Sequence, residues 1–128
     1  MKRLPVLRPL VGLLLAASVT AGCSSSSATP DTVPAGTNLE VHAVTGLRFD
    51  KTAYEVAAGE SVVAYVNDDT IRHTLVVVKD GTKVSGFELH INKKGDIDSG
   101  SVALEPGTYE LICTVPGHQS MKATLTVK

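Results

Sequence analysis

Short apolar runs with a period of two, separated by turn-forming residues, constrain the fold of this chain more than any other feature of the sequence. Leu39, Val41 and Ala43 alternate with Glu40 and His42. Further apolar runs cover residues 62–66, 72–78, 87–91, 101–104, 109–114 and 121–127. No segment keeps the 3.6-residue apolar period of an amphipathic helix over about ten residues. The pattern predicts an all-β antiparallel sandwich or barrel of about seven or eight strands.

Turn signals and chain length fit a single domain. The chain has 128 residues, which leaves room for one hydrophobic core. Glycine, proline, aspartate and asparagine gather between the apolar runs, at 67–69, 80–81, 94–96 and 105–107. These residues are typical of turns because they favour the backbone angles of tight reversals. We expect the folded domain to occupy residues 39–128.

The N-terminal segment has the pattern of a secretory signal peptide. Residues 1–9 carry three basic side chains and no acidic one, the apolar run 10–19 follows, and small residues fill 20–22. The apolar run is too short for a membrane span of about twenty residues. We therefore predict a signal peptide over 1–22 and export of the rest. The alternatives are an N-terminal membrane helix and a disordered leader.

Cys23 lies directly after the small residues of this segment. Ala21-Gly22-Cys23 resembles the lipobox of bacterial lipoproteins, although Thr20 stands where an aliphatic residue is usual. The resemblance implies that Cys23 is lipidated and anchors the chain to the outer face of the cytoplasmic membrane. In the alternative, Cys23 is discarded with an ordinary signal peptide or stays as an incidental thiol. Residues 24–37, rich in serine, proline, glycine and threonine, then complete a flexible tether over 23–38.

The charge of the exported part argues against nucleic acid as a partner. Residues 1–23 hold three of the twelve basic side chains and none of the thirteen acidic ones. The remainder therefore has a formal net charge of −4 with histidine neutral. Such a surface lacks the basic patch that phosphate contacts require.

A thiol, an imidazole and a thioether lie within nine residues near the C-terminus. Cys113, His118 and Met121 flank one predicted turn, and His73 begins another strongly apolar strand. If Cys23 is lipidated or cleaved away, Cys113 is the lone free cysteine and cannot form an internal structural disulfide. Two imidazoles, one thiolate and a weak methionine sulfur are the ligand set of blue-copper electron-transfer sites. We predict that His73, Cys113, His118 and Met121 bind one type 1 copper ion.

Each of these residues has a simpler explanation when taken alone. Cys113 suits a buried small side chain, and Met121 lies in register with core positions. His118 follows Pro116-Gly117 and suits an exposed loop, and His73 suits a strand end. Their coincidence at this spacing is what favours the metal site.

The spacing Cys113-x4-His118-x2-Met121 resembles the C-terminal signature of cupredoxins. The stretch Cys113-Thr-Val-Pro-Gly-His118 is similar to azurin, and the short interval to Met121 is like that of amicyanin. The resemblance covers 39–128 and includes His73 in the position of the first ligand. It implies a Greek-key β-sandwich that carries single electrons between a redox protein donor and acceptor. It also implies a monomer that is no enzyme and binds no small-molecule substrate.

Two functions compete with electron transfer. A copper chaperone, store or sensor would use the same four ligands to hand copper on. A purely structural β-module would carry the motif by accident and bind no copper.

Several residues depart from the family or fall outside the motif. Thr74 stands where an asparagine usually ties the two ligand segments together, so we expect a less firm connection. His42 and His90 are interpreted as structural or surface residues. Asp68-Asp69 is interpreted as a polar turn, with a docking role as a weaker alternative.

Overall fold

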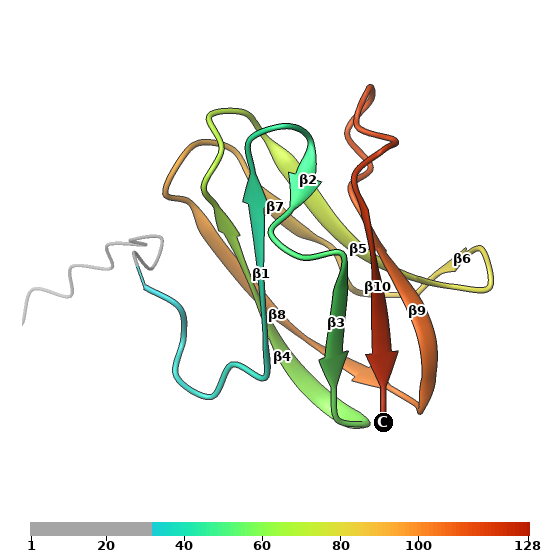
Figure 1. Ribbon diagram of the computed structural model, residues 1–128. Helices are drawn as coiled ribbons and strands as arrows, with labels where there is room; N and C mark the ends of the chain where they lie inside the picture. Colours follow the sequence, from blue (N-terminus) through green and yellow to red (C-terminus); the bar gives the residue numbers. More distant parts are fainter. Residues whose placement is uncertain (1–31) are drawn as a thin grey trace, which may run out of the picture.

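Ten β-strands make up the regular structure of residues 32–128, the part of the chain that this computed structural model describes (Figure 1). No helix occurs within these residues. The strands are β1 (Leu39–Val44), β2 (Arg48–Phe49), β3 (Ala53–Val56), β4 (Gly59–Asn67), β5 (His73–Lys79), β6 (Thr82–Lys83), β7 (Leu89–Ile91), β8 (Ile97–Leu104), β9 (Gly107–Ile112) and β10 (Lys122–Val127).

The strands form two sheets that face each other, as Figure 1 shows. One sheet has the order β2-β1-β4-β8. The other has the order β3-β10-β9-β5-β6, and β7 pairs with the start of β5. The predicted all-β sandwich is confirmed, and the barrel alternative is wrong because the sheets do not close on one another.

Two strand pairings differ from the predicted antiparallel arrangement. β1 pairs with β4 in parallel, and β3 pairs with β10 in parallel, whereas the other six pairings are antiparallel. Between β1 and β4 the chain turns back through β2 and then crosses to the other sheet as β3. It returns as β4 in the direction of β1, and this crossover makes the β1–β4 pair parallel.

The core fills the space between the sheets. Its largest fully buried side chains come from both sheets: Tyr65, Leu75, Ile91, Leu111, Met121 and Leu125. Alternation along each strand accounts for this burial, because every second side chain of β1, β3 and β9 points inward. In β5 six of the seven residues are buried, and β7 pairs with the first three of them.

Several connections meet at one end of the sandwich. The backbone NH of Asn67 donates to Asp96 O over 2.9 Å, and the NH of Gly95 donates to Asn67 O over 2.8 Å. The NH of Asp68 donates to Ala43 O over 2.9 Å. The β4–β5 turn is thereby fixed to β1 and to the β7–β8 turn. The 113–121 loop between β9 and β10 extends from the same end in Figure 1.

The predictions for the N-terminal segment fall mostly outside the described residues. The signal peptide over 1–22, the lipidated Cys23 and most of the tether lie there. Of the tether, residues 34–37 form a turn in which Thr37 Oγ1 donates to Pro34 O over 2.8 Å. Asn38 then bonds to Val62 of β4 through both its backbone and its side chain. Within residues 32–128 no helix is long and apolar enough to cross a membrane.

Candidate metal centre

Three of the four predicted ligands converge at the end of the core. One donor atom each of His73, Cys113 and His118 lies within 4.8 Å of the other two. His73 begins β5, Cys113 follows β9, and His118 lies in the loop before β10. The pairing of β5 with β9 places the two strand ends side by side. The predicted convergence of these side chains is therefore present.

His73 presents an unpaired nitrogen to the cluster. Its side chain is 0% exposed, and its Nδ1 has no hydrogen-bond partner. Its Nε2 lies 3.1 Å from Asp69 Oδ2. Burial lowers the pKa of His73 and the nearby His118 lowers it further, against the opposing effect of Asp69. A neutral ring that donates from Nε2–H leaves the Nδ1 lone pair free for a metal, and a buried lone pair without a partner is otherwise costly.

The Cys113 sulfur is buried among hydrogen-bond donors. It is a free cysteine of 5% exposure, and the backbone NH of Thr74 donates to its Sγ over 3.4 Å. His118 Nδ1 lies 3.6 Å from the same sulfur. The thiolate is the form of cysteine that binds metals.

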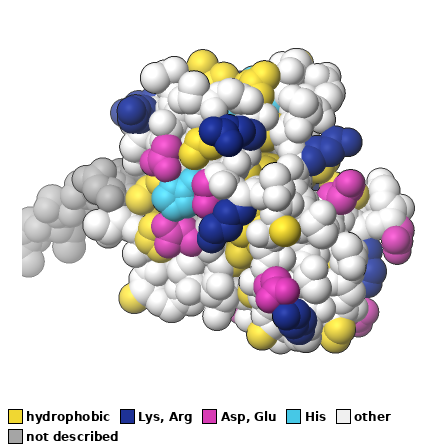
Figure 2. All heavy atoms as spheres, viewed as in Figure 1, with side chains coloured by type: hydrophobic (Ala, Val, Ile, Leu, Met, Phe, Trp, Pro, Cys, Tyr) yellow, Lys and Arg dark blue, Asp and Glu magenta, His cyan; other side chains and the backbone are white. Residues whose placement is uncertain are grey.

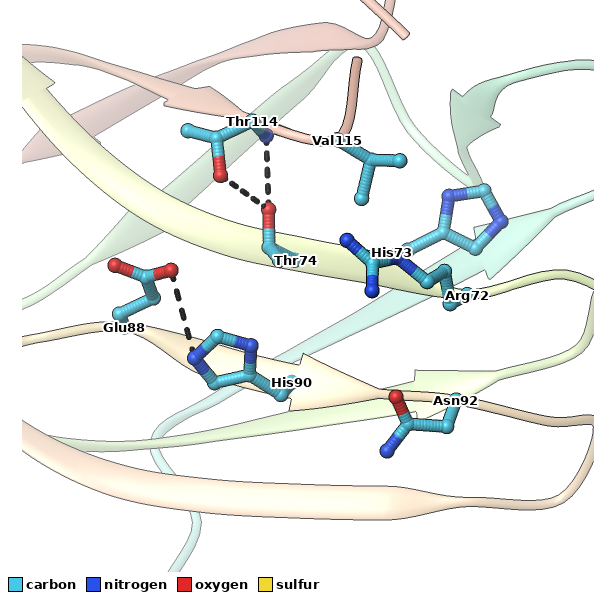
Figure 3. A pocket seen from close by; sticks show the side chains of 8 residues that line it. All are labelled: Arg72, His73, Thr74, Glu88, His90, Asn92, Thr114 and Val115. Carbon is cyan, nitrogen blue, oxygen red and sulfur yellow. Dashed lines mark hydrogen bonds and ion pairs between the residues drawn. The ribbon is translucent and has the colours of Figure 1, made fainter.

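Thr74 ties the two ligand segments together, as Figure 3 shows. The backbone NH of Thr114 donates to Thr74 Oγ1 over 2.8 Å, and the two threonine hydroxyls are also 2.8 Å apart. Thr74 Oγ1 additionally lies 3.7 Å from Cys113 Sγ. The Thr74 hydroxyl therefore makes the connection between the two segments, since it can accept two hydrogen bonds and donate a third. That this connection is less firm than one made by asparagine stays a prediction.

The loop from Cys113 to Met121 is closed by its own backbone. The NH of Cys113 donates to Met121 O over 3.2 Å, and the NH of Met121 donates to His118 O over 2.9 Å. Met121 is 0% exposed, whereas His118 is half-buried. The His73 and His118 rings lie with their centroids 5.0 Å apart. These bonds hold the backbone of Met121 next to that of Cys113 and His118, and the latter two side chains converge with His73.

The donors fit copper better than the other common metals. A thiolate and a thioether are soft ligands that select copper among the metals that imidazole also binds. A closed structural zinc site would require a fourth strong ligand, and methionine sulfur is a weak one. The Nδ1 of buried His73 has no hydrogen-bond partner and is therefore free to bind the metal.

Comparison with known proteins identifies the family. A model of copper binding proteins of the plastocyanin/azurin family matches residues 35–128. The chain belongs to this family. It is a cupredoxin, and its donor set is that of one type 1 copper. No curated protein sequence matches the chain.

Solved cupredoxin structures share the fold. A purple cupredoxin from Nitrosopumilus maritimus is 21% identical with a TM-score of 0.57, over 71% of this chain and 100% of that one. An azurin from Methylomonas sp. strain J is 16% identical with a TM-score of 0.57, over 73% and 99%. A reduced amicyanin variant is 22% identical with a TM-score of 0.54, over 75% and 86%.

The other two histidines of this cupredoxin's described region lie outside the cluster. His42 Nδ1 is 2.6 Å from Asp68 Oδ2, and its Nε2 is 2.7 Å from Glu40 Oε1. Burial lowers the pKa of His42, but the bonds to the two carboxylates outweigh it and the net shift is upward. Figure 2 shows a histidine flanked by acidic side chains in this way. This arrangement favours the imidazolium form of His42, in which both ring nitrogens carry protons and neither can bind a metal.

His90 has a surface position beside a small pocket. Its imidazole is 59% exposed and its Nε2 lies 3.4 Å from Glu88 Oε1. The pocket, of about 240 Å³, lies against the outer side of β5 and is lined by Arg72, His90 and Thr114 among others (Figure 3). The interpretation of His42 and His90 as residues outside the metal site agrees with these positions.

Sequence reasoning missed the contact that Asp69 makes. The sequence pattern indicates a polar turn at Asp69, but its side chain is only 7% exposed and bonds to His73. The backbone NH of Thr70 lowers the pKa of Asp69, and the bond to His73 lowers it further, against the effect of burial. The sequence signal for this contact is an acidic residue four positions before a predicted ligand.

Proposed function

We propose that this cupredoxin carries single electrons between two redox proteins, with copper held by His73, Cys113, His118 and Met121. The observation that carries the proposal is the buried convergence of His73, Cys113 and His118, with the His73 Nδ1 left without a partner. When bound, copper supplies the one-electron Cu(II)/Cu(I) couple. No substrate is bound and no covalent bond is made, so electron transfer requires only that the ligands stay in place.

The surrounding residues keep that geometry fixed. Thr74 and Thr114 join the two ligand segments, and Asp69 orients the His73 ring. Because each ligand comes from a strand end or from a loop closed by backbone bonds, its position is set before metal binding. Little rearrangement then accompanies each electron.

His118 is the proposed route for the electron. It is half-buried, whereas His73 is fully buried, and it follows the short exposed segment Pro116-Gly117. Ile71, at 43% exposure, is the one large exposed hydrophobic side chain among residues 32–128, and it lies in the β4–β5 turn at the same end. A small apolar surface suits brief docking, since weak electron-transfer encounters bury less than about 1,200 Å².

We further propose that the chain acts outside the cytoplasmic membrane as a monomer. A signal peptide over 1–22, lipidation of Cys23 and a tether up to residue 38 would hold the domain at the outer face of that membrane. The basis is the sequence pattern of residues 1–38.

The test is the visible and EPR spectrum of the chain lacking residues 1–23 after addition of one equivalent of Cu(II). We expect an intense thiolate-to-copper charge-transfer band in the wild type and none in Cys113→Ser. An ordinary pale Cu(II) spectrum in the wild type would contradict a type 1 site. A type 1 spectrum with slow electron self-exchange and fast copper transfer to a chelator would favour the copper-handling alternative over electron transfer.

A further inference from the structure

The carboxylate of Asp69 contacts one imidazole of the proposed copper site from outside the ligand set. Its Oδ2 lies 3.1 Å from His73 Nε2, and the two side chains are 7% and 0% exposed. The opposite nitrogen of the same ring, Nδ1, is the one without a partner. A bond at one ring nitrogen determines which nitrogen carries the proton, and therefore which one is free to bind metal.

The β4–β5 turn holds Asp69 in this orientation. Asn67 Oδ1 accepts from the backbone NH of Asp69 over 3.0 Å, and Asn67 Nδ2 donates to Ile71 O over 2.9 Å. The other carboxylate oxygen, Asp69 Oδ1, accepts from the NH of Thr70 over 2.7 Å. One oxygen is thus bound to the turn itself, and the other is directed at His73.

The two imidazoles of the cluster differ in this respect. Within residues 32–128, the ring of His118 makes one polar contact, between its Nδ1 and Cys113 Sγ at 3.6 Å. His73 has a buried carboxylate behind it, whereas the ring of His118 has none. A negative charge in a region of low dielectric acts strongly on a nearby cation, and more strongly on a doubly charged one.

We infer that Asp69 is a positioning residue that holds His73 as its Nε2–H tautomer and biases the copper site toward Cu(II). A carboxylate that accepts from a ligand imidazole orients the ring and raises its basicity. Both effects favour the ion of higher charge, so the carboxylate lowers the reduction potential. The inference deepens the proposed function and rests on it.

The test compares Asp69→Asn with Asp68→Asn in the copper-loaded protein. Asp68 is a matched control because it is the adjacent carboxylate, is 51% exposed and bonds to His42 instead of a ligand. Competition with chelators gives the Cu(II) and Cu(I) dissociation constants of each variant. We expect Asp69→Asn to weaken Cu(II) binding about 10–100-fold and Cu(I) binding less. Each tenfold fall in the Cu(II)-to-Cu(I) affinity ratio raises the potential by about 59 mV. For Asp68→Asn we expect a change in that ratio below about threefold.

A second measurement uses the wild-type protein without metal, and so does not depend on the variants folding. Nitrogen-15 NMR of the imidazoles distinguishes the two tautomers, and we expect the Nε2–H form for His73. An Nδ1–H form overturns the inference, as does an affinity ratio in Asp69→Asn that matches that of Asp68→Asn. If the wild type fails to bind copper through Cys113, the proposed function itself fails, which is a different result.

Discussion

Replacement of Asn67 by alanine tests whether the buried turn that carries Asp69 holds the copper end together. Asn67 is 0% exposed, and its side chain bonds to the backbone of both Asp69 and Ile71. The substitution removes two hydrogen bonds of about 0.5–1.5 kcal/mol each and leaves a buried NH unpaired, at about 1–3 kcal/mol. We expect Asn67→Ala to lower the free energy of unfolding by about 2–6 kcal/mol.

Asn38 supplies a control of the same chemistry. Its Oδ1 accepts from the backbone NH of Val62 over 2.7 Å, but this bond is exposed to solvent. In Asn38→Ala water replaces the lost partner, so we expect a loss of only about 0.5–1.5 kcal/mol. Because Asn67 loses two hydrogen bonds and Asn38 loses one, a loss in Asn67→Ala that is more than twice the loss in Asn38→Ala measures the added cost of burial.

Urea denaturation of the metal-free variants, followed by circular dichroism, measures both free energies. Equal losses in Asn67→Ala and Asn38→Ala would refute the argument, because burial would then have no effect. A loss confined to copper affinity, with the free energy of unfolding unchanged, would also refute it. It would mean that the turn positions His73 without stabilising the sandwich.

Substitutions at two further residues test other parts of the fold. The pKa of His42 in the folded protein is raised above 6.5, so the stabilisation it provides is present below that pH and is lost as pH rises through the folded pKa. We therefore expect His42→Gln to lower the free energy of unfolding, measured by urea titration, by about 0.2–1 kcal/mol at low pH and by less at high pH. The opposite trend would show that a charged His42 between Glu40 and Asp68 does not stabilise the fold. Met121 is 0% exposed. In the metal-free protein we expect Met121→Ala to lower the free energy of unfolding by about 2–5 kcal/mol, whereas Met121→Leu should lower it by less than about 1.5 kcal/mol. Similar losses in those two variants would show that Met121 does not fill the core.

The donor cluster was predictable from sequence because its spacing is local and its side chains are chemically rare. Cys113, His118 and Met121 lie in one loop between adjacent strands, so sequence spacing alone brings them close. Because side chains alternate along a strand, His73 is expected on the same buried face as Leu75, and His73 is buried in the structure. The family follows from the same residues, as the comparison confirms.

Features that depend on tertiary contacts were not predictable in this way. β2 and β6 have two residues each, too few to show a period of two. The parallel pairings follow from a crossover between sheets that no local pattern records. The direction of the Asp69 carboxylate depends on the bonds of Asn67, which form only when the turn is folded. Thr74 reaches Thr114 because β5 lies beside β9, a long-range pairing.

The parallel pair of β3 and β10 has a consequence for the order in which this protein takes shape. Ala53–Val56 pairs with Lys122–Val127, and β10 follows every other described strand in the chain. While the chain is synthesised, or threaded through a pore from its N-terminus, β3 lacks its neighbour until β10 emerges. The loop that bears Cys113, His118 and Met121 also emerges late. A nascent chain that has emerged only as far as β8 can collapse, but it lacks the loop with three of the four metal ligands. Copper can therefore bind at this site only when nearly all of the sandwich has been made.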